Sequence, residues 1–287
     1  MLRVHVLGAG LPTPTANRFG SAFVVQLDDE YIMFDCGPAA TDKLVKAGLW
    51  PTKISHLFFT HHHFDHNADY GCFVLTRWDQ QLNHDNDLSV FGPPPTSLIT
   101  ESLIGENGVF ACDWNARIHH ESSKRVYVNR GGVLPRQPPR VLTHDVGPGL
   151  IHHQENWEVV ADTAVHVQPY LDSLAYRINT PQGSVVFTGD TELCDSVVNL
   201  AKGANVLVGM CWDEQESIEA SGETQSVSGT IAMATMAQAA GVRIFAPVHC
   251  GPFVSDPVAK ARADAQIKAI FDGEVIWAPE VSSFDVH

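Results

Sequence analysis

The chain has 287 residues, of which 44% are hydrophobic and 18% charged, and this globular composition excludes a disordered or collagen-like protein. Its formal net charge is −15, so we expect neither a general nucleic-acid binder nor a binder of anionic membranes, although a local basic patch remains compatible with that sum. No apolar run reaches the roughly 18 residues of a membrane span, and we expect no signal peptide. Six scattered cysteines without a CxxC pair indicate reduced thiols in a cytoplasmic protein.

Strand patterns dominate the first 60 residues. The two runs on either side of an acidic turn at 28–30 suggest a hairpin, and Gly48 and Pro51 end the one predicted helix. The last run is short and apolar, as in a buried strand. The predicted strands are 2–7, 22–27, 31–34 and 54–60, and the predicted helix is 41–47.

Regularity returns after about residue 150, whereas residues 67–148 are rich in proline and glycine and are predicted to be less regular. Strands and helices in both halves together indicate an α/β sandwich of two sheets with helices outside. We expect one domain over residues 1–287, with an insertion at about 67–150 that shapes the substrate pocket. The later predicted strands are 157–168, 173–178, 184–188, 206–210, 242–248 and 274–278, with helices at 228–240 and 257–271.

A cluster of metal-binding residue types follows directly after the strand predicted at 54–60. Imidazole and carboxylate groups are good ligands for zinc and similar divalent ions. Four such groups within six residues are too close together for one tetrahedral site, so a tight turn could direct the first two to one ion and the last two to a neighbouring ion. A solvated polar loop is disfavoured because an apolar strand delivers the cluster. The four residues are His61, His63, Asp65 and His66.

With this HxHxDH motif the chain resembles the metallo-β-lactamase superfamily. The resemblance covers most of the chain and implies the αββα sandwich of that family, in which two mixed sheets pack face to face. Five further elements occur in the family's order: residues 7–12 (LGAGLP), residues 34–37 (FDCG), His166, the triplet Gly189-Asp190-Thr191, and His249.

The resemblance also implies the metal ligands and their chemistry. It implies a dinuclear hydrolase that uses a metal-bridging hydroxide, with two zinc ions expected and manganese or iron as alternatives. Asp65 and Asp190 would be the catalytic carboxylates, and Asp35 is a candidate acceptor for the N–H of a ligand histidine. His62 occupies a variable position of the motif and is expected outside the ligand set. One ion would be held by His61, His63 and His166, the second by Asp65, His66 and His249, with Asp190 bridging both.

Residues 88–93 and 174–178 resemble the branch that contains tRNA 3′-processing nucleases and arylsulfatase-like enzymes. Three departures argue against the nuclease. Only 24 residues separate His166 from Asp190, too few for a substrate-gripping arm; Val227-Ser228-Gly229 stands where the nuclease carries a proton-donating histidine; and the net charge is −15.

We therefore expect a small organic substrate cleaved at an ester, lactone, phosphodiester, sulfate ester or activated aryl halide, with neither nucleic acid nor membrane as partner. The alternative is a tRNA 3′-processing-type endoribonuclease. A mononuclear iron dioxygenase, a non-catalytic binding protein and a homodimer stay open. So does a general-acid role for one of four other histidines, which are His119, His120, His152 and His153.

Overall fold

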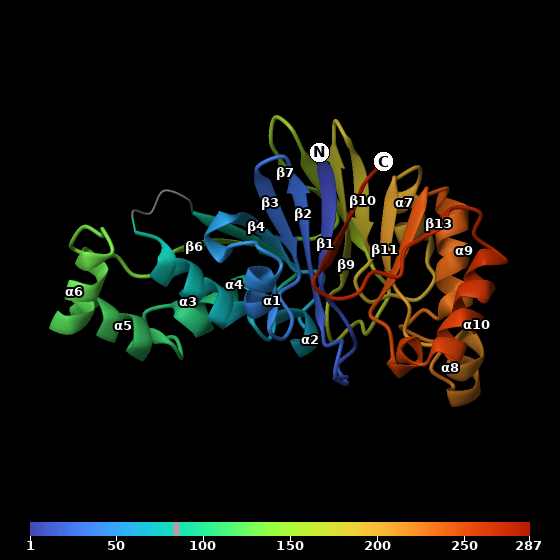
Figure 1. Ribbon diagram of the computed structural model, residues 1–287, viewed down its shortest axis with the longest axis horizontal. Helices are drawn as coiled ribbons and strands as arrows, with labels where there is room; N and C mark the ends of the chain where they lie inside the picture. Colours follow the sequence, from blue (N-terminus) through green and yellow to red (C-terminus); the bar gives the residue numbers. More distant parts are fainter. Residues whose placement is uncertain (83–86) are drawn as a thin grey trace.

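The computed structural model describes residues 1–82 and 87–287 as two seven-stranded sheets packed face to face, with helices on the outer faces (Figure 1). The first sheet is antiparallel from β14 to β3 and parallel from β3 to β6. Its strands, in spatial order, are β14 (Ser282–Asp285), β1 (Leu2–Ala9), β2 (Ser21–Leu27), β3 (Glu30–Phe34), β4 (Ile54–Phe58), β5 (Leu88–Gly92) and β6 (Val141–Asp145).

The second sheet is parallel from β13 to β10 and antiparallel from β10 to β7. Both sheets are therefore mixed, and the predicted αββα sandwich is confirmed. Its strands, in spatial order, are β13 (Glu274–Val275), β12 (Ile244–Val248), β11 (Val206–Met210), β10 (Gly183–Phe187), β9 (Leu174–Thr180), β8 (Glu158–Thr163) and β7 (Gly149–His153).

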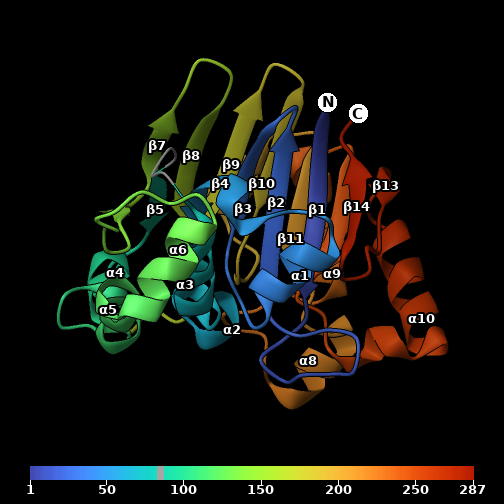
Figure 2. The ribbon, with the colours of Figure 1, turned by 60° about the vertical axis from the view of Figure 1, so that its left-hand side comes forward.

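Helices cover the outer face of each sheet (Figures 1 and 2). None of the helices in the described part of the chain combines the length and the apolar character that a membrane crossing requires. The helices are α1 (Ala40–Lys46), α2 (Phe64–Asn67), α3 (Tyr70–Gln80), α4 (Thr96–Ile104), α5 (Ala111–His119), α6 (Glu121–Asn129), α7 (Asp195–Ala201), α8 (Gln215–Ser221), α9 (Thr230–Ala240) and α10 (Pro257–Lys268), with 3-10 turns at Pro51–Lys53 and Pro252–Ser255.

Aromatic side chains fill the space between the two sheets. The ring of Phe34 stacks on that of Phe187 from the other sheet, with 4.2 Å between ring centroids, and on that of Phe58 at 5.3 Å. All three rings are buried, and burial of such large apolar groups is the main favourable contribution to folding. This core holds the strand ends that carry the polar motifs in a rigid arrangement.

The structure differs from the sequence-based expectation of a less regular pattern in residues 67–148, whose described part contains four helices and two strands. Helices α5 and α6 are short and each buries one aromatic side chain, Trp114 and Tyr127. So narrow an apolar stripe produces a weak periodic signal, and the prolines that suggested loops, with most of the glycines, lie between the elements. The strand predicted at 157–168 is also shorter, because β8 ends at Thr163.

Candidate metal centre

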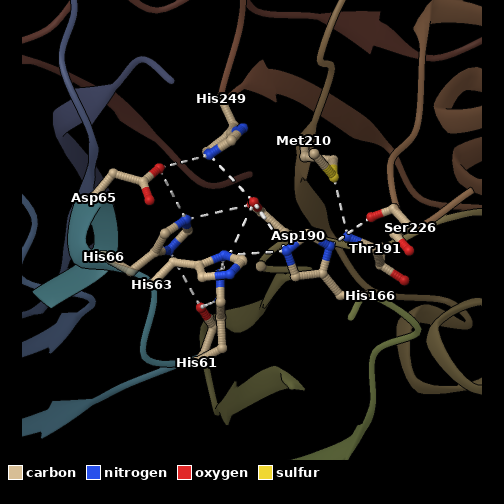
Figure 3. A network of polar contacts seen from close by, with 12 residues as sticks. His61, His63, Asp65, His66, His166, Asp190, Thr191, Met210, Ser226 and His249 are labelled. Atoms are coloured by element: carbon tan, nitrogen blue, oxygen red, sulfur yellow. Dashed lines mark hydrogen bonds and ion pairs between the residues drawn. The ribbon is translucent and has the colours of Figure 1, made fainter. Parts of the chain in front are cut away.

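The predicted ligands come from separate loops that meet at one edge of the sandwich. His61 follows β4, Asp190 follows β10 and His249 follows β12, so each stands just beyond the carboxyl end of a strand. Parallel neighbours such as β10, β11 and β12 bring these ends to the same edge, where active sites of open α/β sheets lie. Helix α2 supplies Asp65 and His66 at this edge (Figure 3).

Three imidazole nitrogens converge in the first group of residues. His63 Nδ1 lies 3.1 Å from His61 Nε2 and 3.2 Å from His166 Nε2. Two ligands bound tetrahedrally at the usual zinc–nitrogen distance are about 3.3 Å apart, so this spacing fits a shared ion. The ligand atoms of these three histidines and Asp190 all lie within 4.8 Å of one another.

The second group consists of Asp65, His66 and His249, whose ligand atoms also lie within 4.8 Å of one another. Asp65 Oδ2 is 3.1 Å from His249 Nε2 and 3.6 Å from His66 Nε2. All three side chains are buried. A buried carboxylate facing two imidazoles is a donor set that zinc, manganese or iron accepts.

Asp190 lies between the two groups (Figure 3). Its Oδ1 atom is 3.4 Å from His66 Nε2, and its Oδ2 atom is 3.3 Å from His249 Nε2 and 3.8 Å from His166 Nε2. Within the described chain, His66 Nε2 and Asp190 Oδ1 are buried without a hydrogen-bond partner. Because buried polar atoms normally have partners, these two atoms are suited to metal coordination. The residues therefore fit a two-ion centre with Asp190 shared.

Residues behind the ligands fix the ligands' orientation. Asp35 Oδ2 accepts a hydrogen bond from His66 Nδ1 at 2.8 Å, as the sequence predicts, and Asp35 Oδ1 accepts from the Thr60 N–H at 2.8 Å. His166 Nδ1 donates to the Ser226 carbonyl oxygen at 2.6 Å. Such partners set the tautomer and the direction of a ligand imidazole. Sequence reasoning missed Thr60 and Ser226. The position of Thr60 just before the motif could have indicated a supporting role. Ser226 contributes only a main-chain carbonyl, which residue type does not reveal.

Burial and charge act in opposite directions on the ionisable groups of this centre. Burial, with His66 next to it, lowers the pKa of His61 well below its usual value, so that ring is neutral and its lone pair is available. Burial also opposes charge on His66, but the carboxylates of Asp190 and Asp35 outweigh burial and raise its pKa well above the usual value. Burial raises the pKa of Asp190, but the neighbouring His249 and His66 outweigh burial, and the pKa of Asp190 is well below its usual value.

The backbone around the centre is closely packed and locally strained. Asp35, Ser226 and His249 adopt positive φ angles of 57°, 69° and 51°, which are uncommon for residues other than glycine. A Cβ atom on Gly37 would lie 2.1 Å from the Asp65 carbonyl oxygen, which explains the glycine of the FDCG element.

The remaining histidines of the motif analysis have other contacts. His62 Nε2 lies 2.7 Å from Thr96 Oγ1 at the start of α4, which confirms that His62 is outside the ligand group. His119 is exposed, and His120 Nδ1 accepts from the Ser122 N–H at the start of α6.

On β7, His152 packs against Trp157, and His153 faces Glu158. Among the described contacts, none of the four candidate general acids touches the ligand groups. The Ser228 hydroxyl donates to the Thr191 carbonyl at 2.7 Å, so the triplet around it offers no acidic proton donor.

Comparison with known proteins decides the family. The sequence pattern described as "Metallo-beta-lactamase superfamily" matches residues 16–220. A ribonuclease Z of Mycolicibacterium gilvum (strain PYR-GCK) is 30% identical over 209 residues, which cover 72% of this chain and 68% of the relative. The chain belongs to the metallo-β-lactamase superfamily. It is thereby a hydrolase of that superfamily, and it resembles the tRNA 3′-processing branch.

Solved structures of this superfamily share the fold over nearly the whole chain. The short form of human tRNase Z matches with a TM-score of 0.70, 18% identity and 99% coverage of both chains. YhfI of Bacillus subtilis, a protein of the metallo-β-lactamase fold, matches with a TM-score of 0.72, 18% identity and 99% coverage of both chains.

The comparisons correct the expected partner. The prediction of a small-molecule substrate and no nucleic acid is wrong, because the curated relatives of this chain are ribonucleases. The expectation rested on three departures, of which the net charge of −15 is the electrostatic one, although that sum left a local basic patch open. A whole-chain sum does not determine the local field that a polyanion meets.

Proposed function

We propose that this protein is a metal-dependent phosphodiesterase that acts as an endoribonuclease on the 3′ side of tRNA precursors. The observation that carries the substrate assignment is the likeness to ribonuclease Z over 72% of the chain. The seven converging histidine and aspartate side chains support the metal dependence, because their spacing and burial suit two divalent ions. We propose zinc as the resident metal, two ions per chain.

In this proposal the bound ions, the two carboxylates and the groups that orient the ligand histidines have different roles. Bound ions would supply Lewis acidity toward a phosphodiester oxygen and a water acidic enough to act as nucleophile near neutral pH. Asp65 would accept a hydrogen bond from that water and orient it, while Asp190 stays ionised between the two groups because its pKa is well below the usual value. Asp35 and the Ser226 carbonyl would hold His66 and His166 in place.

The proton donor for the leaving group is expected to be solvent. Ser228 stands where a histidine would be needed, and its hydroxyl is engaged with a carbonyl oxygen. A poor leaving group gains most from general acid catalysis, whereas a nitrophenolate needs none. We therefore expect a shallower pH dependence for a nitrophenyl phosphodiester than for RNA.

A cleavage assay tests the proposal. Purified protein loaded with zinc, manganese or ferrous iron is incubated with a labelled 3′-extended tRNA precursor and, separately, with bis-p-nitrophenyl phosphate. We expect one endonucleolytic cut at the 3′ side of the tRNA and complete loss of cutting with chelator. The Asp190→Ala variant is the matched control for contaminating nuclease. Hydrolysis of the nitrophenyl compound without precursor cleavage would overturn the RNA assignment, and a protein that binds no metal would overturn the whole proposal.

A further inference from the structure

Charge is distributed unevenly along this acidic chain. Residues 111–140 hold six of its 18 Lys and Arg residues but only two of its 33 Asp and Glu residues. Helices α5 and α6 lie in this stretch and pack on each other. Figure 1 shows them at one extreme of the longest axis, away from α2 and the metal centre, and Figure 2 shows them beside α3 and α4. We call this basic projection the α5–α6 hairpin.

The hairpin is anchored to α3 through shared arginine contacts. Arg136, with a side chain only 4% exposed, lies over the rings of Trp78 and Tyr127 at 3.9 and 4.7 Å. Its guanidinium donates to Asp79 Oδ1 at 3.0 Å. Packing on two aromatic faces holds the guanidinium rigidly and leaves its charge uncancelled by them.

Two further arginines share the same carboxylate. Arg130 Nη1 and Arg117 Nη1 lie 3.1 and 3.3 Å from Asp79, and the side chain of Arg117 is 45% exposed. Arg117 also bonds Asp113, whose carboxylate is partly exposed. Three guanidiniums thus meet two carboxylates, those of Asp79 and Asp113, so one positive charge remains in excess there.

A cleft of about 290 Å³ opens between α3, α5 and α6. Guanidinium and hydroxyl groups, all able to donate hydrogen bonds, make up most of its polar lining, and one carboxylate is the exception. Planar guanidiniums match the geometry of phosphate oxygens and bind them in pairs. The lining residues are Asp79, Arg117, Ser122, Ser123, Val126, Tyr127, Arg130 and Arg136.

Two more cations lie on α6 beside the cleft. Arg125 is exposed and makes no ion pair within the described residues. Lys124 pairs with Glu121 at 2.8 Å, and because Glu121 is highly exposed this ion pair is weak and easily exchanged for another anion. Both cations are therefore available to an anionic partner.

We propose that the α5–α6 hairpin and the cleft at its base are the surface on which the substrate RNA docks through its backbone phosphates. The inference rests on the proposed function. The hairpin lies in a stretch, residues 111–140, whose Lys and Arg residues outnumber its Asp and Glu residues, and it stands apart from the metal centre. A substrate that contacts both must therefore be a macromolecule, and a small phosphodiester reaches only the metal centre.

Binding of a fluorescent 3′-extended tRNA precursor tests this surface without cleavage. Anisotropy is measured in chelator between 50 and 200 mM salt for the wild type and for Lys124→Ala/Arg125→Ala. We expect Kd to rise about tenfold, and the slope of log Kd against log salt to fall by about 2, since two phosphate contacts are lost. The matched control is Lys202→Ala/Arg243→Ala, two exposed cations on the α7–β12 side, which should leave Kd within about twofold.

A second variant, Arg117→Gln, examines the cleft itself and should raise Kd several-fold. Turnover of bis-p-nitrophenyl phosphate by each metal-loaded variant reports on the fold, and it should match the wild type. Wild-type affinity in both the double variant and Arg117→Gln would overturn the inference, as would a wild-type protein that does not bind the precursor.

A second copy of this acidic chain is the competing occupant of the hairpin, because α6 also exposes Val126 and Val128. Sedimentation distinguishes this dimer from RNA docking. If the wild type is a dimer, and the Lys124→Ala/Arg125→Ala variant is a monomer with unchanged RNA affinity, RNA docking on the hairpin is overturned. The two proposals can also fail separately. Precursor bound through the hairpin but never cut would refute the proposed nuclease and leave the docking surface standing. Precursor cut equally well by the hairpin variants would refute only the docking surface.

Discussion

Two groups of histidines in the same sandwich have different surroundings. The first comprises the five histidines of the two ligand groups, which also contain Asp65 and Asp190; within it, His63 Nδ1 lies 3.1 and 3.2 Å from the nearest nitrogens of His61 and His166. The second consists of His56, His144 and His152, on β4, β6 and β7. Its rings stack on aromatic neighbours, as His144 does on Phe91 at 4.6 Å.

One strand and the loop that follows it carry members of both groups, which shows that residue type alone does not make a site. His56 lies in β4 and His61 just beyond its end, about 16 Å apart in an extended chain. Burial, followed by the nearby His152, lowers the pKa of His56 to about 4. Burial of His66 is instead outweighed by two carboxylates. Carboxylates among the imidazoles therefore distinguish the metal centre from aromatic packing.

Removing the shared carboxylate should have the largest effect. Asp190→Ala takes away the group that faces both halves of the centre, so we expect metal content to fall from two ions per chain to one or none. Turnover should fall by at least about a thousandfold, equivalent to several kcal/mol of lost transition-state stabilisation. Elemental analysis and the precursor assay measure both, with the exposed Glu216→Ala as control. Two tightly held ions in the variant would contradict the shared position.

Weakening a support residue should have a smaller effect on the same centre. Asp35→Asn keeps the shape but removes the charged acceptor of the His66 Nδ1 hydrogen bond. Metal affinity, measured by competition with a chromogenic chelator, should fall by about 10- to 100-fold. Asp162→Asn, in a partly exposed carboxylate on β8, is the control. An unchanged affinity would mean that Asp35 serves only the Thr60 turn.

Burial of His56, a member of the second group of histidines, should be measurable in the pH dependence of the free energy of unfolding. The unfolded chain protonates His56 as the pH falls below its ordinary pKa of 6.5, whereas the folded chain keeps it neutral down to about 4. The unfolded state then binds more protons, so the free energy of unfolding falls between pH 6.5 and 4, by on the order of 2 to 3 kcal/mol. His56→Phe should lose this component in urea titrations, and His153→Gln should retain it. Parallel pH profiles for the wild type and His56→Phe would refute the prediction.

The smallest effect is expected from His144, the exposed histidine of the second group. His144→Ala should lower the free energy of unfolding by no more than about 1 kcal/mol, since a partly exposed stacked pair contributes little. Its metal content should equal that of the wild type, whereas His61→Ala should lose an ion. Loss of metal from His144→Ala would erase the distinction between the two groups.

The strongly patterned parts of this protein were predictable from its sequence. Ten of the fourteen strands in the described residues coincide with predicted strands, and the acceptor role expected of Asp35 matches its hydrogen bond with His66. Residues 67–148 were not predictable, because α5 and α6 each bury only one aromatic ring. His166 bonds the main-chain carbonyl of Ser226, which is 60 residues away in the chain. This contact was not predictable, because any residue type supplies a main-chain carbonyl.

The sequence by itself determined the sandwich, through local periodicity, and the superfamily, through its resemblance in the HxHxDH motif and the elements around it. Donor chemistry together with that resemblance indicated which side chains could serve as metal ligands. The resemblance implied a bridging Asp190, but only the tertiary structure showed the distances that place it between the two ligand groups, and it alone decided that three arginines share Asp79. Both depend on distances between residues remote in the chain. Coulomb interactions vary with distance and burial, so a net charge of −15 could not reveal a basic hairpin on an acidic body.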